Sequence, residues 1–75
     1  TIGYELPSSM SITLNVYDIS GRLIRNLDDG FKNIGVHSVV WDGKDHIGNQ
    51  VSSGIYFYRS VLNERIKTRK MILAK

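Results

Sequence analysis

The sequence contains no cysteine, one proline, two histidines and no long run of apolar residues. Without cysteine, a disulfide cannot support the fold and a thiolate-ligated metal site is excluded. The apolar runs are only a few residues long, whereas a membrane-spanning helix needs about 20, so we expect no transmembrane segment. A chain of 75 residues is enough for one domain with a modest core. We therefore expect a single domain over residues 1–75.

The net charge of +3 is unevenly distributed along the chain. Up to Tyr58, four basic and six acidic residues give a charge of −2; from Arg59 onwards, six basic residues and one acid give +5. A basic segment of this kind can bind nucleic acid, an anionic surface or an acidic partner. Lys67 and Arg69 alternate with residues of the opposite face, as on a solvated strand, and charge protects an edge strand from further pairing. We therefore expect an exposed edge strand, with docking of a specific partner as the second interpretation and no nucleic-acid binding.

Apolar residues alternate with polar ones through most of the chain, which is typical of strands. We expect six strands, at residues 1–6, 11–17, 22–27, 35–41, 55–62 and 65–74, with the fifth in a central position. Turn-forming residues occupy 7–9, 18–21, 28–30 and 63–64, and residues 31–34 look irregular enough to cover one end of the core. Ile24 and Leu27 can both be buried only if the third strand contains a bulge or a bend.

No stretch has the period of a helix, and turn residues recur at short intervals. This pattern is typical of an all-β fold in which short antiparallel strands form two packed sheets. The sequence therefore predicts a small immunoglobulin- or fibronectin-III-like antiparallel β-sandwich of six to seven strands. The chain opens with Thr1 in what looks like a strand, so we expect it to be a fragment of a longer protein.

The stretch 41–58 concentrates the only tryptophan and many turn residues between two aromatic-rich strands. Glycine reaches positive φ without strain, and aspartate accepts hydrogen bonds from nearby backbone. We therefore expect a loop of defined shape, anchored in the core by Trp41 and Tyr56. The indole N–H of Trp41 should find a partner at the rim of the core.

Oxygen-bearing side chains in this loop raise the question of a metal site. Asp42, Asp45 and Asn49 lie close together, but Lys44 and His46 occupy the alternate positions and no closing glutamate follows. A helix–loop–helix calcium site is therefore rejected. An irregular calcium site remains an alternative interpretation. We favour the interpretation in which these side chains fold the loop onto its own backbone. No metal ligand or cofactor is predicted.

Histidine and serine also occur in the loop, but not in a pattern that favours catalysis. His46 and Asp45 are near Ser52 and Ser53 in sequence, yet all four lie on one turn-rich loop without a G-x-S-x-G elbow. His37 has the parity of an inward-facing strand residue. We predict no catalytic residue and expect the chain not to be an enzyme.

Four motifs of the chain together resemble a known family. They are T-I-x-Y-x-L-P, V-Y-D-x-x-G-R, G-x-H-x-V-x-W-D-G-x-D-x-x-G-x-x-V-x-S-G-x-Y-x-Y-R and the final K-M-x-L-x-K. The chain resembles the type A C-terminal sorting domain of type IX secretion substrates, and the related immunoglobulin-like domain of the flagellar hook-capping protein. The structural motif comprises Asp18, Gly21, Trp41, Asp42, Gly43, Asp45, Gly48, Gly54, Tyr56 and Tyr58.

The resemblance implies a non-catalytic C-terminal module that directs secretion and cell-surface attachment of a larger exported protein. Its partners would be outer-membrane secretion and attachment machinery and a neighbouring domain of the parent chain. The sorting-signal candidates are Lys70, Met71, Leu73 and Lys75, and their match to the end of such domains predicts a true C-terminus. The alternative is a structural immunoglobulin-like module, of the hook-capping type or a spacer beside a catalytic domain. Carbohydrate binding by an exposed strand face, with Ile55 and Phe57, is a weaker third hypothesis.

Overall fold

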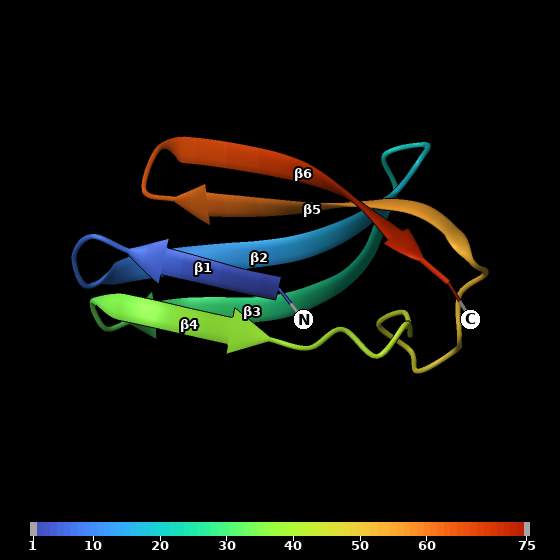
Figure 1. Ribbon diagram of the computed structural model, residues 1–75, viewed down its shortest axis with the longest axis horizontal. Helices are drawn as coiled ribbons and strands as arrows, with labels where there is room; N and C mark the ends of the chain where they lie inside the picture. Colours follow the sequence, from blue (N-terminus) through green and yellow to red (C-terminus); the bar gives the residue numbers. More distant parts are fainter. Residues whose placement is uncertain (1, 75) are drawn as a thin grey trace.

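The computed structural model describes residues 2–74, and these form six antiparallel strands (Figure 1). The strands are β1 (Ile2–Leu6), β2 (Met10–Asp18), β3 (Leu23–Lys32), β4 (Gly35–Val39), β5 (Gly54–Leu62) and β6 (Arg65–Leu73). β1 pairs with β4, and the other four strands form a sheet in the order β3-β2-β5-β6. The predicted small β-sandwich is confirmed, with a central β5 and β6 at an edge.

The core is built by alternate residues of β2, the strand in the middle of the sandwich. Ile12, Leu14 and Val16 are at most 3% exposed, and their neighbours in sequence face the other side of the sheet. Val16 forms a cluster with Ile24 and Tyr56. Ile2 and Leu6 bring the small sheet onto the same core from β1. Every second side chain in this part of β2 is thus buried in the core, as the alternating sequence predicts.

β3 contains the irregularity that is expected if Ile24 and Leu27 both face the core. Its register with β2 shifts twice, because Leu27 and Ile24 are each passed over in the pairing. Ile24 is buried and Leu27 packs against the core cluster. An extra residue in one strand turns its neighbours to the opposite face, so two side chains of different parity can both point inward. The predicted bulge is confirmed.

Three boundaries predicted from the sequence are wrong. Residues 28–30 are not a turn, because Asp28, Asp29 and Gly30 pair with β2 within a ten-residue strand. The backbone hydrogen bonds that the nine-residue β2 offers override the local turn preference. Residues 31–34 do not cover the core, since Phe31 is 67% exposed. The fourth strand ends at Val39 and leaves Trp41 in the loop that follows.

Candidate functional site

The loop between β4 and β5 is anchored by two aromatic rings. The rings of Trp41 and Tyr56 meet edge to face, with centroids 5.1 Å apart and planes at 68°. The indole N–H of Trp41 donates to the carbonyl of Lys44 at 2.9 Å, and the hydroxyl of Tyr56 donates to the carbonyl of Ser52 at 2.7 Å. Each ring therefore packs on the core and holds the loop backbone with its polar atom. The predicted anchoring is confirmed.

The carboxylates of the loop accept hydrogen bonds from the loop itself. Oδ1 of Asp45 accepts the N–H groups of Ile47 and Asn49 at 3.1 and 2.9 Å. Oδ1 of Asp42 accepts the N–H of Lys44 at 3.1 Å and the guanidinium of Arg25 on β3 at 2.7 Å. Both side chains thus fix the loop's shape, in agreement with the interpretation favoured from the sequence. These contacts all fall on the Oδ1 atoms of the two side chains.

Glycine supplies the sharpest turn of this loop. Gly48 has φ 92°, a left-handed conformation that other residues rarely adopt, and its N–H donates to the carbonyl of Asp45 at 3.1 Å. Gly43 is buried and its carbonyl accepts the N–H of Val51 at 2.9 Å. Gly54 begins β5. These predicted motif residues all lie where the backbone turns or closes on itself.

The loop's histidine holds the loop against β3. The N–H of His46 donates to the carbonyl of Ile24 at 3.0 Å, and its ring Nδ1 lies 3.3 Å from the same oxygen. His37 lies on β4, where its ring stacks on Tyr4 with centroids 5.3 Å apart. Both histidines therefore make contacts that support the fold. Within residues 2–74, no group of three or more His, Cys, Asp or Glu is placed to hold a metal ion.

The turn from β2 to β3 repeats the same use of aspartate. Oδ1 of Asp18 accepts the hydroxyl and the N–H of Ser20 and the N–H of Arg22, at 2.7, 3.0 and 2.9 Å. Gly21 follows with φ 88° and donates its N–H to the carbonyl of Asp18. The predicted turn is confirmed in both its aspartate and its left-handed glycine.

Asp18 should make the stability of the domain depend on acid. Hydrogen bonds from Ser20 and from the N–H of Arg22 hold the pKa of Asp18 below its ordinary value. A lowered pKa in the folded state gives stability that is present above the unfolded value, about 3.9, and is lost as the pH falls further. At pH 7 we expect Asp18→Asn to melt below wild type, and the gap to close below about pH 4. Thermal denaturation from neutral to acid pH measures both; a gap that persists unchanged in acid contradicts the assignment.

A network joining the two sheets was not predicted from the sequence. The hydroxyl of Tyr4 on β1 donates to Oδ2 of Asp28 on β3 at 2.8 Å, and Oδ1 of Asp28 pairs with Nζ of Lys32 at 2.8 Å. The Lys32 contact, followed by the Tyr4 hydrogen bond, lowers the pKa of Asp28 despite its partial burial. Residues 24 positions apart meet here because the sheets pack face to face, and no local motif signals such a contact.

Tyr4 should reduce stability in alkali. Burial, helped by the hydrogen bond to Asp28, raises the pKa of Tyr4 to about 12. Above the unfolded value of about 10, the unfolded chain has lost the phenolic proton while the folded chain retains it, so stability falls as the pH rises. We expect Tyr4→Phe to be less stable than wild type by about 1 kcal/mol at pH 8, because the network is only partly buried. Urea denaturation should show this difference vanishing between about pH 10 and 12; a constant difference contradicts the account.

Three of the four sorting-signal candidates, Lys70, Met71 and Leu73, lie on the edge strand β6, and they do not share one environment. Lys70 is exposed, whereas Met71 and Leu73 pack partly buried against the core cluster. Lys75 lies outside the described residues. Tyr58, on the neighbouring β5, also packs against the cluster. Within the described residues, the candidates thus divide into one surface residue and two that contribute to packing.

The aromatic residues of β5 alternate between the two faces of the sheet. Tyr56 and Tyr58 face the core, while Phe57 lies on the outer face with Ile55, which is 39% exposed. On that outer face the guanidinium of Arg59 lies over the ring of Tyr17, 4.8 Å from the ring centroid. The outer face thus holds a small mixed surface rather than a row of stacked aromatic rings.

Comparison with known proteins agrees with this architecture. The family model described as the FlgD Ig-like domain matches residues 1–61. The chain belongs to this family. The match includes the β2–β3 turn and the whole loop between β4 and β5, which carry the structural motif. The resemblance to the hook-capping immunoglobulin-like domain is therefore confirmed at the level of the family.

Two relatives carry the name basal-body rod modification protein FlgD, one from Salmonella typhimurium and one from Salmonella typhi. Each is 40% identical to the chain over 45 residues, which is 60% of this chain and 19% of the relative. The similarity thus spans about a fifth of each relative's length. In the part of the chain that the structure describes, no helix is long and apolar enough to cross a membrane.

Proposed function

We propose that the chain is a non-catalytic structural module that holds a fixed shape within a larger exported protein or assembly. The observation that carries this proposal is the match of residues 1–61 to the FlgD Ig-like domain. Flagellar rod and hook structures assemble outside the cytoplasm, so we also propose an extracellular or periplasmic location. The partner would be a neighbouring domain or subunit of the same assembly.

The use of the polar residues supports this proposal. Asp18, Asp42 and Asp45 each accept at least two hydrogen bonds from nearby groups, and most of these come from the loop or turn that the residue occupies. Side chains that take part in a reaction must instead face a substrate with suitable partners around it. The residues that stand out in the sequence therefore serve shape.

The dimensions of the domain suit a spacer. It measures 36 × 20 × 20 Å, and its strands run along the long axis (Figure 1). A force applied along this axis would act along the strands, which are hydrogen-bonded side by side in two sheets. A rod of this shape can hold two neighbours at a set distance.

A domain exchange tests the structural role. The Ig-like domain of FlgD from Salmonella typhimurium is replaced by residues 1–75 of this chain in a strain that lacks its own FlgD. We expect the chimera to restore swimming at least in part, and the same chimera with Val16→Asp to fail because a charge is placed in the core. A chimera that accumulates and is exported normally but does not swim overturns the proposal.

A second candidate is the sorting and surface-attachment role, favoured by the K-M-x-L-x-K motif, which begins on the edge strand β6. Removing residues 70–75 would also remove Met71 and Leu73, which pack against the core cluster. A deletion therefore cannot distinguish the loss of a sorting signal from the loss of stability. The better test fuses the chain behind an exported reporter in a bacterium with type IX secretion. We expect Lys70→Ala, but not Thr68→Ala at a position that is also exposed, to trap the reporter in the periplasm. Retention of the reporter with the unaltered domain refutes this candidate.

A further inference from the structure

The two sheets of the sandwich differ in width. The large sheet has four strands and the small sheet has two, with β1 paired to β4 alone in the described part of the chain. Figure 1 shows β1 and β4 in front of β2 and β3, while β5 and β6 extend beyond them. The other edge of β1 therefore presents backbone N–H and C=O groups without a neighbouring strand.

The inner face of β6 carries cations where the small sheet ends. The register places Arg65 beside Leu62, Lys67 beside Ser60 and Arg69 beside Tyr58; further along, Met71 lies beside the buried Tyr56. Residues directly opposite in an antiparallel pair share a face, so all three cations lie on the core side of the sheet. They nevertheless remain exposed, and none takes part in an ion pair with another residue in 2–74. The sequence interpretation of Lys67 and Arg69 as an ordinary solvated face is therefore incomplete.

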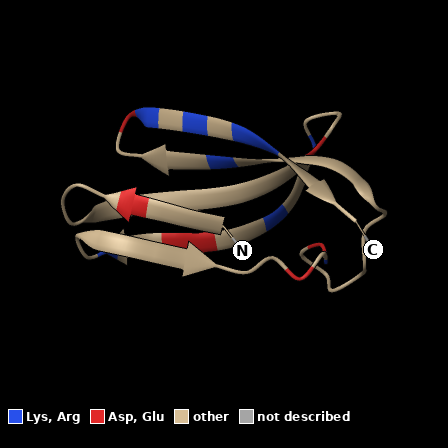
Figure 2. Ribbon diagram, viewed as in Figure 1, with Lys and Arg blue, Asp and Glu red and all other residues tan. Residues whose placement is uncertain are grey.

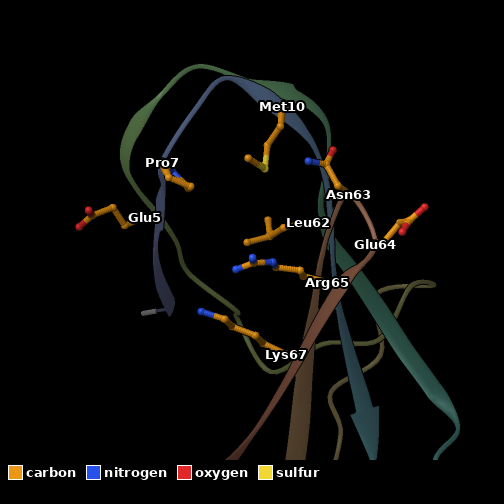
Figure 3. Close-up of a pocket in the computed structure, with 8 residues that line it drawn as sticks. All are labelled: Glu5, Pro7, Met10, Leu62, Asn63, Glu64, Arg65 and Lys67. Carbon is orange, nitrogen blue, oxygen red and sulfur yellow. The ribbon is translucent and has the colours of Figure 1, made fainter.

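Three adjoining hollows form a slot between β1 and β6. At one end, a hollow of about 410 Å³ is lined by Ile2, Trp41, Tyr58, Met71 and Leu73, among others. The middle hollow, about 230 Å³, shares Ile2 and Tyr58 with it and adds Lys67 and Arg69. The far hollow, about 640 Å³, continues from Lys67 to Arg65 and Leu62 (Figure 3). Basic residues thus line all three hollows, with Lys70 in the first, and the apolar side chains of Met71 and Leu73 lie at the end near Ile2.

Charge on the two sides of the slot is unequal. Figure 2 shows basic residues along β6 and a single acidic position on β1, which is Glu5. In Figure 3 the side chains of Arg65 and Lys67 reach into the hollow, while that of Glu5 points away from them. Glu5 and Glu64 also line the basic end of the slot, where three cations, Arg65, Lys67 and Arg69, outnumber these two carboxylates.

We propose that this slot binds an extended acidic segment of a partner protein, which adds to β1 as a third strand of the small sheet. The free edge of β1 supplies main-chain hydrogen bonds, as in other cases of strand addition. Inward-facing side chains of the segment would be apolar over Met71 and Leu73 and carboxylates over Lys67, Arg69 and Arg65. The slot is a property of the sandwich itself and does not depend on the proposed function.

A synthetic peptide tests the proposal on the 75-residue chain. The peptide is about nine residues long, within the usual range for strands, with blocked ends. Valine fills its first two inward positions, glutamate the next two and threonine the outward ones; a second version carries the inward residues in the opposite order, since the strand direction is open. Calorimetry measures affinity, and amide hydrogen exchange followed by NMR identifies the strand that becomes protected. We expect saturable binding by one version, weaker at high salt, with slowed exchange of β1 amides.

Charge reversal supplies the matched variants. The double variant Lys67→Glu with Arg69→Glu should weaken binding of the glutamate peptide about tenfold, and should bind a lysine version of the peptide instead. Arg59→Glu reverses a single charge on the outer face of the same sheet and should leave the affinity unaltered; Arg69→Glu alone is its matched inner-face counterpart and should weaken binding. The gain of lysine-peptide binding shows that the double variant still folds.

The outcomes are distinct. Binding with protection of β1 and the predicted charge exchange supports strand addition. Binding that protects other strands, or that Arg59→Glu weakens equally, overturns the proposal. Absence of saturable binding by both peptide versions at millimolar concentration also overturns it. Self-association of the chain through β1, seen by light scattering and not displaced by either peptide, would assign the slot to a second copy and overturn the acidic partner.

Discussion

Replacing Leu14 by alanine is expected to lower the free energy of unfolding by about 2–5 kcal/mol. Leu14 is 1% exposed and lies on β2, which pairs with both β3 and β5 in the large sheet. The smaller side chain leaves a cavity that rigid strands on both sides cannot fill. A domain of this length has a total stability of only about 4–11 kcal/mol. Urea denaturation followed by circular dichroism should therefore show a much lower midpoint or a chain that is already partly unfolded.

Val36→Ala is the matched control for Leu14→Ala. Val36 also lies on a strand, but its side chain is 78% exposed. We expect its loss to change the free energy of unfolding by no more than about 0.5 kcal/mol. Equal effects of the two substitutions would contradict the position of the core on the inner face of β2.

Replacing Trp41 by alanine should lower the free energy of unfolding by about 2–4 kcal/mol, because it removes a large, partly buried ring. The loss includes the edge-to-face contact with Tyr56 and the indole hydrogen bond to Lys44. Trp41→Phe retains an aromatic ring and removes the N–H, so its expected effect is about 1 kcal/mol. Chemical denaturation followed by circular dichroism compares the two, since tryptophan fluorescence is lost in both.

The same two variants should differ in the order of the loop. Without the ring at Trp41, the amides of Asn49 and Val51 should exchange faster, because the hydrogen bonds that close the loop are no longer supported by the core. Trp41→Phe should retain most of this protection. If Trp41→Ala lowers the stability but leaves loop exchange unaltered, the tryptophan stabilises the core without shaping the loop.

Much of the fold could be predicted from the sequence because alternation of apolar residues and turn-forming residues specify it locally. Alternation along Ile12, Leu14 and Val16 predicts the strand β2, and burial of both Ile24 and Leu27 requires a bulge. Aspartate and glycine placed the turn at residues 18–21, where side-chain hydrogen bonds act within a few residues. Part of the loop was also predictable, since the hydrogen bonds of Asp45 act within four residues, whereas the contacts of Asp42 and His46 with β3 are distant in sequence.

The remaining features depend on how the two sheets meet. Asp28 and Gly30 look like turn residues, but pairing with the long β2 keeps them in β3. The hydrogen bond from Tyr4 to Asp28 joins strands whose packing no local pattern specifies. The cations of β6 were recognised as an alternating set, yet only the unequal width of the sheets shows that Lys67 faces an open slot.

The most direct test of the account concerns the loop between β4 and β5, for whose carboxylates we propose a role in shaping the loop rather than in binding a cation or in a reaction. Two-dimensional NMR of the ¹⁵N-labelled chain is recorded with calcium chelated and then with added calcium. We predict slow exchange for the amides of His46, Asn49 and Val51 in both conditions, and no saturable shift of the Asp42 and Asp45 amides. Saturable shifts at these aspartates, or protection that appears only with calcium, would contradict the central claim and make the loop a binding site.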